Sequence, residues 1–281
     1  MKVNLATSAG FCFGVRRAID IAMETAKTNK PVFMLGDIVH NEEVVGQIQK
    51  SGIKKISRLG QGNGKTLLIR AHGCSKNTLQ TARNSGYSII DATCPMVKDI
   101  HATAKRLENS GFKIIVIGDR SHDEVKGIVG QLKAAAIVID KLENIPLKKI
   151  KSIKKAGVIV QSTQNLDKTQ KIVNVLRKNI PQVEFHNTIC KPTRSKQNEV
   201  KVMPLKNDVI IVIGSKTSAN TKRIYEISKS LNSKSYWVNS SAEIKGNWLA
   251  KAKNVGITAG ASTPETTIRE IIRKIKAISA A

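Results

Sequence analysis

Short apolar runs alternate along the chain with longer amphipathic stretches, a pattern typical of parallel α/β folds. The predicted strands cover residues 30–35, 66–69, 113–117, 157–160, 208–213 and 254–258. After Cys12, apolar residues from Val15 to Ala26 recur at the i, i+3, i+4, i+7 spacing of one helix face. A similar stretch follows Cys94 and ends near Gly111, so we expect strands and helices to alternate.

The strands belong to a threefold internal repeat. The run VFMLGDIVHNE (32–42) aligns without a gap with IIVIGDRSHDE (114–124), and VIIVIGSKTSAN (209–220) continues the same frame. The frame places His40, His122 and Ser218 in equivalent positions. A second set of strand ends, AHG, QST and GAS, delivers His72, Ser162 with Thr163, and Ser262.

A third set of strand ends carries cysteine. IIDATCP (89–95) ends at Cys94 and VEFHNTICKP (183–192) at Cys190, while the third copy comes from the N-terminus as VNLATSAGFC (3–12), ending at Cys12. The first strand therefore completes the last unit. We predict three α/β units: residues 13–94, residues 95–189, and residues 190–281 together with 1–12.

Parallel sheets bind ligands beyond the carboxyl ends of their strands. We therefore expect three small parallel-sheet units in a pseudo-threefold, trefoil arrangement around a central cavity, with Cys12, Cys94 and Cys190 converging on a metal centre. Cys74 lies outside this frame, because it follows the middle set of strand ends.

Three thiolates suit an iron–sulfur cluster or zinc. Most four-iron clusters use four cysteines, so three would leave one iron without a protein ligand and able to act as a Lewis acid. A zinc site of three cysteines and a histidine is the alternative, and buried structural cysteines are a third reading. The sequence contains no CxxC pair.

The predicted strand ends also carry hydrogen-bond donors and few acids. Such a set favours a diphosphate over a cation. Its members are His40, His72, His122, Ser218, Asn220 and Ser262.

Glu124 is the predicted acid, since a buried carboxyl can hold and deliver a proton. Glu42 occupies the same place in the first repeat, so spacing alone does not choose between them. Ser162 or Thr163 would position the carboxyl.

Two other patterns resemble functional sites but are expected to be structural. Residues 60–66, GQGNGKT, resemble a phosphate-binding loop but are one residue short and precede a strand, so we predict a connecting turn. His101 and His186 lie near cysteines and are expected to be packing residues.

The composition and net charge of the chain argue against several classes of protein. The chain has 281 residues, 41% hydrophobic, with 47 Lys and Arg against 21 Asp and Glu and a net charge of +26. It lacks a membrane-length apolar run and an export signal, which predicts a cytoplasmic location. Aromatic residues are only 4% and the lysines are dispersed, so no nucleic acid is expected. The charge suits a phosphorylated substrate or an acidic partner, or merely reflects a lysine-rich genome.

The sequence resembles the 4-hydroxy-3-methylbut-2-enyl diphosphate reductases of the non-mevalonate isoprenoid pathway. The resemblance runs over essentially the whole chain and rests on GFCFGVRRAI, VHN, AHG, DATCP, SHDEVKGIVGQ, QSTQ, TIC, GSKTSANT and TAGAS. It implies three α/β units around one [4Fe-4S] cluster held by Cys12, Cys94 and Cys190.

The resemblance also implies roles for the remaining residues. Glu124 would be the acid, which resolves the ambiguity with Glu42. The substrate-binding residues would be His40, His72, His122, Ser162, Ser218, Ala219, Asn220 and Ser262. The implied reaction is a two-electron, two-proton loss of the allylic hydroxyl that gives isopentenyl or dimethylallyl diphosphate. An acidic electron donor, a ferredoxin or a flavodoxin with its reductase, is the expected partner.

Four features depart from the family's pattern: Ser162 where Thr is usual, Ala219 where Ser is frequent, Cys74 after AHG, and Pro204 in the irregular stretch after Cys190. From the residues alone, a zinc-dependent hydrolase and an RNA-binding α/β protein with structural cysteines are the alternative functions.

Overall fold

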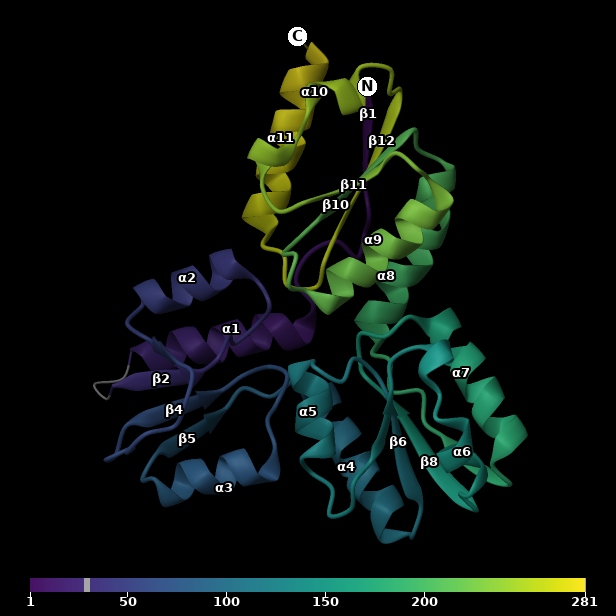
Figure 1. Ribbon diagram of the computed structural model, residues 1–281. Helices are drawn as coiled ribbons and strands as arrows, with labels where there is room; N and C mark the ends of the chain where they lie inside the picture. The colour runs from purple at the N-terminus through teal and green to yellow at the C-terminus, as the bar shows by residue number, and fades with distance from the viewer. Residues whose placement is uncertain (28–30, 281) are drawn as a thin grey trace. The chain divides into compact units, whose positions relative to one another are not determined.

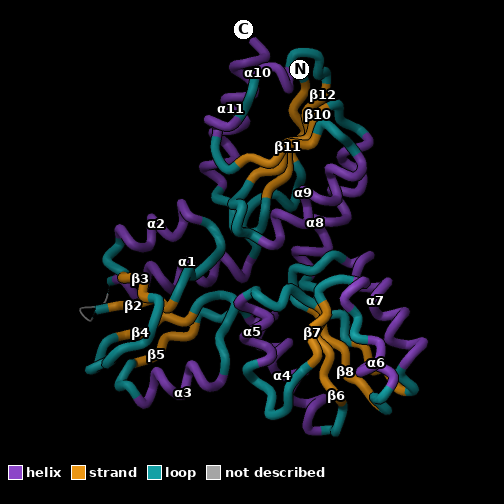
Figure 2. Tube along the Cα trace, in the orientation of Figure 1, coloured by secondary structure: helices purple, strands orange, loops and turns teal. Residues whose placement is uncertain are grey.

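Three parallel sheets form the framework of the protein (Figures 1 and 2). The structure is a computed structural model that describes residues 1–27 and 31–280. Within these residues the sheets have four strands each, in the orders β3-β2-β4-β5, β7-β6-β8-β9 and β1-β12-β10-β11. The α/β class with three small parallel sheets, predicted from the repeat, is therefore confirmed.

The strands are short, as expected for small sheets. Their bounds are β1 Lys2–Leu5, β2 Val32–Leu35, β3 Lys54–Ile56, β4 Thr66–Ile69, β5 Ser88–Asp91, β6 Lys113–Ile117, β7 Ile137–Ile139, β8 Lys155–Val160, β9 Gln182–Phe185, β10 Val209–Ile213, β11 Ser235–Val238 and β12 Asn254–Ala259. Each of the six predicted runs overlaps one of these strands, although β8 begins two residues earlier and β12 ends one residue later than predicted. The first predicted residue of the first run, Lys30, lies outside the described residues.

Within the described residues, helices occupy the connections between strands except the one from β3 to β4. The α-helices are α1 Phe13–Ala26, α2 Glu42–Lys50, α3 Lys76–Asn84, α4 Pro95–Asn109, α5 Asp123–Val129, α6 Leu147–Lys151, α7 Leu166–Asn179, α8 Lys191–Val202, α9 Ala219–Leu231, α10 Gly246–Leu249 and α11 Glu265–Ala280. Short 3₁₀ turns are η1 Leu142–Asn144, η2 Met203–Leu205 and η3 Ser241–Glu243. Pro204 lies in η2, where α8 has ended, as its missing N–H predicts.

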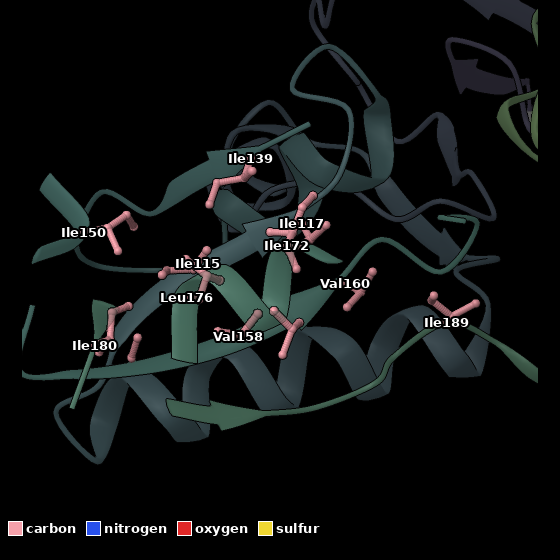
Figure 3. Packing of buried hydrophobic residues seen from close by; sticks show 12 residues of the cluster. Ile115, Ile117, Ile139, Ile150, Val158, Val160, Ile172, Leu176, Ile180 and Ile189 are labelled. Carbon is pink, nitrogen blue, oxygen red and sulfur yellow. The ribbon is translucent and has the colours of Figure 1, made fainter. Parts of the chain in front are cut away.

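Helices cover both faces of the sheets, which is why the strands read as continuous apolar runs. In β6, Ile115 and Ile117 face the cluster that includes α7, whereas Ile114 and Val116 pack with α4 and α5. Figure 3 shows the first of these clusters at close range, with Ile172 and Leu176 among its members. In the third sheet, α8 and α9 lie on one side and α10 and α11 on the other (Figure 1).

The N-terminal strand is part of the third sheet. β1 pairs in parallel with β12, from Lys2 opposite Asn254 to Leu5 opposite Ile257. This strand occupies the same edge as β5 and β9 occupy in the other two sheets.

By its packing the chain divides into two compact units. Unit 1 comprises Met1–Arg16, His40–Gly46 and Lys191–Ala281, and unit 2 comprises Arg17–Val39 and Gln47–Cys190. Unit 1 contains the third sheet, and unit 2 contains the first and second. The division into three units at residues 94 and 189, and their arrangement around a central cavity, stay predictions.

None of the helices in the described part of the chain combines the length and apolar character that a bilayer crossing requires.

Candidate functional site

The predicted site residues are distributed over both units. Unit 1 carries Cys12, His40, Ser218, Ala219, Asn220 and Ser262. Unit 2 carries Cys94, Cys190, His72, His122, Glu124 and Ser162.

The three repeat cysteines occupy equivalent backbone positions. The N–H of Cys94 donates to the carbonyl of Ala71 (2.9 Å), two residues beyond the end of β4. In the other sheets, the N–H groups of Cys190 and Cys12 donate to the carbonyls two residues beyond β8 and β12, those of Ser162 and Ala261 (both 3.1 Å).

Each of these cysteines also directly precedes a helix: Cys12 precedes α1, Cys94 precedes α4 and Cys190 precedes α8. The backbone N–H groups and dipole of a helix N-terminus stabilise negative charge such as that of a metal-bound thiolate. All three are half-buried, and none is in a disulfide. Thiols that precede a helix and form no disulfide are the type of donor that a thiolate-ligated metal or cluster requires.

Glu124 is buried in unit 2, on the first turn of α5, and is 1% exposed. Its carboxylate accepts from the Ser162 N–H (2.6 Å) and from the Ser162 hydroxyl (2.7 Å). Burial raises the pKa of Glu124, and the two hydrogen bonds from Ser162 offset only part of that rise. Of the two predicted positioning residues, Ser162 makes this contact, whereas the Thr163 hydroxyl accepts from Gln161 (3.0 Å).

Glu42, the equivalent residue in the first repeat, has a different environment. It is exposed, and its carboxylate accepts from the hydroxyls of Ser215 (2.8 Å) and Thr217 (3.3 Å) in unit 1. The next residue, Glu43, accepts from Thr267 (2.6 Å). These bonds attach the start of α2 to the third sheet.

Two predicted histidines meet in unit 2. The rings of His72 and His122 lie edge to face with centroids 5.5 Å apart. The Nδ1 atom of His122 accepts from the Glu124 N–H (3.1 Å), so a neutral ring carries its proton on Nε2 and can donate it to an anion. Arg70, two residues before His72, forms an ion pair at 2.5 Å with Asp123, the residue after His122.

In unit 1, the loop after β10 leads into α9. Ser218 is the N-cap of α9, and its hydroxyl accepts from the Thr221 N–H (3.3 Å). Ala219 begins the helix, and Asn220 is 4% exposed. Within the described residues, neither amide atom of Asn220 has a hydrogen-bond partner. A buried amide in this state is typical of a position where a ligand supplies the partner.

His40 and Ser262 also lie together in unit 1. The Ser262 hydroxyl donates to the His40 carbonyl at 2.9 Å, and Ser262 is 6% exposed. The predicted binding residue Ser262 therefore also connects the loop after β12 to the segment that carries His40.

Cys74 belongs to another environment. It lines a cavity of about 220 Å³ with His101 and Gln131, and burial raises the pKa of its thiol to about 11. Burial, together with Lys105, lowers the pKa of His101 to about 4. His186 contacts Glu184 at 2.7 Å. The GQGNGKT segment connects β3 to β4, which confirms the predicted connecting turn before a strand.

Several structural partners of the site were not predicted. The Arg70–Asp123 pair carried a sequence signal, since opposite charges adjoin the AHG and SHDE motifs. Arg17 and Lys196, which contact the loops preceding two of the cysteines, carried none, because nothing in the sequence distinguishes them from exposed basic residues.

Comparison with known proteins gives one consistent result. Residues 3–276 match the family model described as LytB protein. The chain is 38% identical over 277 residues to the 4-hydroxy-3-methylbut-2-enyl diphosphate reductase of Geobacter sulfurreducens, covering 98% of this chain and 97% of the relative. It is 36% identical over 282 residues to the enzyme of that name from Aquifex aeolicus, covering 99% and 97%.

Solved structures agree. One, of (E)-4-hydroxy-3-methyl-but-2-enyl diphosphate reductase, the terminal enzyme of the non-mevalonate pathway, is 35% identical with a TM-score of 0.72, covering 99% of this chain and 100% of that one. Another, of the E-1-hydroxy-2-methyl-but-2-enyl-4-diphosphate reductase from Plasmodium falciparum, is 28% identical with a TM-score of 0.90, covering 97% and 87%.

Proposed function

The chain belongs to the LytB protein family, and from this premise we propose that it reduces (E)-4-hydroxy-3-methylbut-2-enyl diphosphate as an iron–sulfur oxidoreductase of the non-mevalonate pathway. The proposed cofactor is one [4Fe-4S] cluster. The proposed products are isopentenyl and dimethylallyl diphosphate. The reaction takes up two electrons and two protons and releases the allylic hydroxyl as water.

The equivalence of the three cysteines is the observation that supports this proposal most strongly. Each N–H group donates to the carbonyl two residues beyond a central strand, and each residue precedes a helix. Cys12, Cys94 and Cys190 would hold the cluster. When bound, such a cluster supplies electrons and an iron without a protein ligand, which can polarise a substrate oxygen.

Glu124 is the proposed proton donor. Burial raises its pKa, so the carboxyl keeps its proton at a higher pH than an exposed glutamate does. Ser162 holds both carboxylate oxygens in place. The same serine hydroxyl would orient the substrate alcohol, so that the proton passes from the Glu124 carboxyl to the departing oxygen.

The diphosphate is the proposed ligand of the remaining polar residues. His72 and His122 would donate ring N–H groups, and the Asn220 amide would donate to a phosphate oxygen. The backbone at Ser218 and Ala219 begins α9, where the helix N-terminus favours an anion. His40 and Ser262 complete the proposed set.

The electrons would come from an acidic protein such as a ferredoxin or flavodoxin. The net charge of +26 supports such a partner, because complementary charge accelerates encounter.

Anaerobic purification followed by a turnover assay tests the proposal. We expect brown protein with broad visible absorption, iron and sulfide in the ratio of one cubane per chain, and conversion of the hydroxylated diphosphate that depends on added reductant. Cys12→Ser, Cys94→Ser and Cys190→Ser should each lose iron, whereas Cys74→Ser should retain it.

Colourless protein with stoichiometric zinc would contradict the proposed cofactor. Iron-loaded protein that leaves the hydroxylated diphosphate unchanged in the presence of reductant would contradict the proposed reaction.

A further inference from the structure

Lys196 of α8 is almost entirely buried, with 1% of its surface exposed. Its ammonium group donates to three backbone carbonyls, those of Ser8, Gly10 (3.0 Å) and Ala259 (3.2 Å). These contacts occupy all three donors of the group. Burying a charge is costly unless its donors are satisfied, so the loop from Ser8 to Gly10 is tied to this cation.

The same loop is held by a second residue of α8. The Glu199 carboxylate accepts from the N–H groups of Thr7 (3.0 Å) and Ser8 (3.0 Å) and from both of their hydroxyls. Although burial raises the pKa of Glu199, the bonds from Ser8 and Thr7 lower it overall. Lys196 and Glu199 therefore hold the chain over four consecutive residues, and Cys12 follows two residues later.

Gly10 allows this loop to approach its surroundings closely. Its φ is +90°, and a Cβ atom would lie 3.2 Å from Ile268 Cδ1. The Cys12 N–H then donates to the Ala261 carbonyl. The backbone leading to the Cys12 thiol is thus held from α8 on one side and from the end of the third sheet on the other.

A comparable contact precedes Cys94. The Arg17 guanidinium of α1 donates to the carbonyl of Thr93 (3.2 Å), the residue before Cys94. Arg17 lies on the helix that follows Cys12, and Lys196 lies on the helix that follows Cys190. In both cases, a basic side chain from the helix after one cysteine contacts the backbone before another cysteine. Arg17 connects the helix after Cys12 to the backbone before Cys94, and Lys196 connects the helix after Cys190 to the backbone before Cys12.

The loop before Cys190 is held differently. The Thr188 hydroxyl accepts from the Val160 N–H (2.8 Å) and donates to the Val160 carbonyl (2.5 Å). These contacts involve neither Lys196 nor Arg17, so Cys190 is the internal control for substitutions of these two residues.

We propose that Lys196 and Arg17 are positioning residues, which hold the backbone so that Cys12 and Cys94 present their thiols to a metal cluster. The inference rests on the proposed function for the cluster, but the backbone contacts are measurable without it. Residues that orient metal ligands influence metal retention even though they do not touch the metal.

Amide hydrogen exchange tests the contacts in the full chain purified anaerobically. Lys196→Met should make the Cys12 amide exchange about tenfold faster, and Arg17→Met should do the same for the Cys94 amide. The Cys190 amide should be unchanged in both variants. Lys274→Met, at an exposed position of α11, is the matched control and should change none of the three.

Iron retention tests the consequence for the metal. We expect both variants to lose iron to a chelator several-fold faster than the wild type, and the electron paramagnetic resonance spectrum of the reduced protein to broaden. Lys196→Arg and Arg17→Lys, which keep a cationic donor, should restore retention. If Lys196→Met does not fold, Glu199→Gln loosens the same loop without removing a buried cation, and it should accelerate exchange at Cys12 alone.

Equal acceleration at all three cysteines would overturn the inference, because it indicates general destabilisation. Unchanged exchange, or wild-type iron retention in both variants, would overturn it too. A wild-type chain that binds no iron would instead refute the proposed cofactor, while the exchange pattern would still decide whether the cations hold the loops.

Discussion

Glu124 and Glu42 occupy the same place in the repeat, yet their surroundings make them different chemical groups. Glu124 is 1% exposed and receives two donors from Ser162, whereas Glu42 is exposed and bonded to the hydroxyls of Ser215 and Thr217. The spacing in the sequence does not show which of the two glutamates is the acid. Their burial distinguishes them, and burial depends on residues that are distant in the chain.

This difference predicts the effect of removing each acid. Glu124→Gln should bind the diphosphate substrate normally but reduce it about 100-fold more slowly, because the amide cannot donate the carboxyl proton. Glu42→Gln should keep most of the activity. Turnover rates and substrate affinity measured side by side check this, and a Glu124→Gln variant with near-normal turnover would remove Glu124 from the proton-donor role.

The raised pKa of Glu124 also predicts how stability depends on pH. Because the folded state binds this proton more tightly than the unfolded state, the contribution of Glu124 to stability is complete below the ordinary pKa of 4.5 and is lost as pH rises through the folded-state pKa. Glu124→Gln cannot ionise and avoids this loss. In urea unfolding of the metal-free chain, its advantage over the wild type should therefore grow with pH, while exposed Glu143→Gln should show a constant difference; a flat Glu124→Gln difference would contradict the burial argument.

At the scale of elements, the central strands were predictable and some edge strands were not. β4 and β6 match their predicted bounds, because both faces of these strands are covered and their sequences are almost uniformly apolar. β3 is three residues long and contains two lysines, so its sequence gives no strand signal. This segment is a strand because its backbone pairs with β2, from Lys54 opposite Phe33 to Ile56 opposite Leu35.

Packing between α5 and the start of α3 depends on a residue without a side chain. A Cβ atom on Gly130, the C-cap of α5, would lie 2.2 Å from the Ser75 Cβ, and the Lys76 N–H donates to the Gly130 carbonyl (3.1 Å). Gly130→Ala should lower the free energy of unfolding by about 1–3 kcal/mol through overpacking.

Gly46→Ala is the matched comparison for this change. Gly46 lies within α2 and a Cβ atom there would meet nothing within 4 Å, so the alanine should raise stability by about 0.5–1 kcal/mol. Chemical unfolding of both variants checks the opposite signs. A neutral Gly130→Ala would show that α5 and α3 can separate without cost.

At the scale of the molecule, the repeat predicted where the cysteines lie in the backbone. It did not predict which side chains contact the loops around them. The frame predicted that Cys12, Cys94 and Cys190 follow equivalent strands, because strand ends in parallel sheets recur with the repeat. Lys196 escaped prediction, since its burial depends on carbonyls from Ser8 and Ala259 that lie far from it in the sequence.

The net charge of +26 leads to a prediction for the whole molecule. If an acidic protein delivers the electrons, long-range attraction accelerates its encounter with this chain, and salt screens that attraction over about 10 Å at 0.1 M. With saturating substrate, kcat/KM for an acidic flavodoxin or ferredoxin should therefore fall about tenfold between low and high ionic strength. Turnover driven by a small neutral photoreductant should stay nearly constant over the same range, because an uncharged donor experiences no steering. Parallel decreases with both donors would place the salt effect on the diphosphate or on folding, and the basic surface would then have no part in recognising the electron donor.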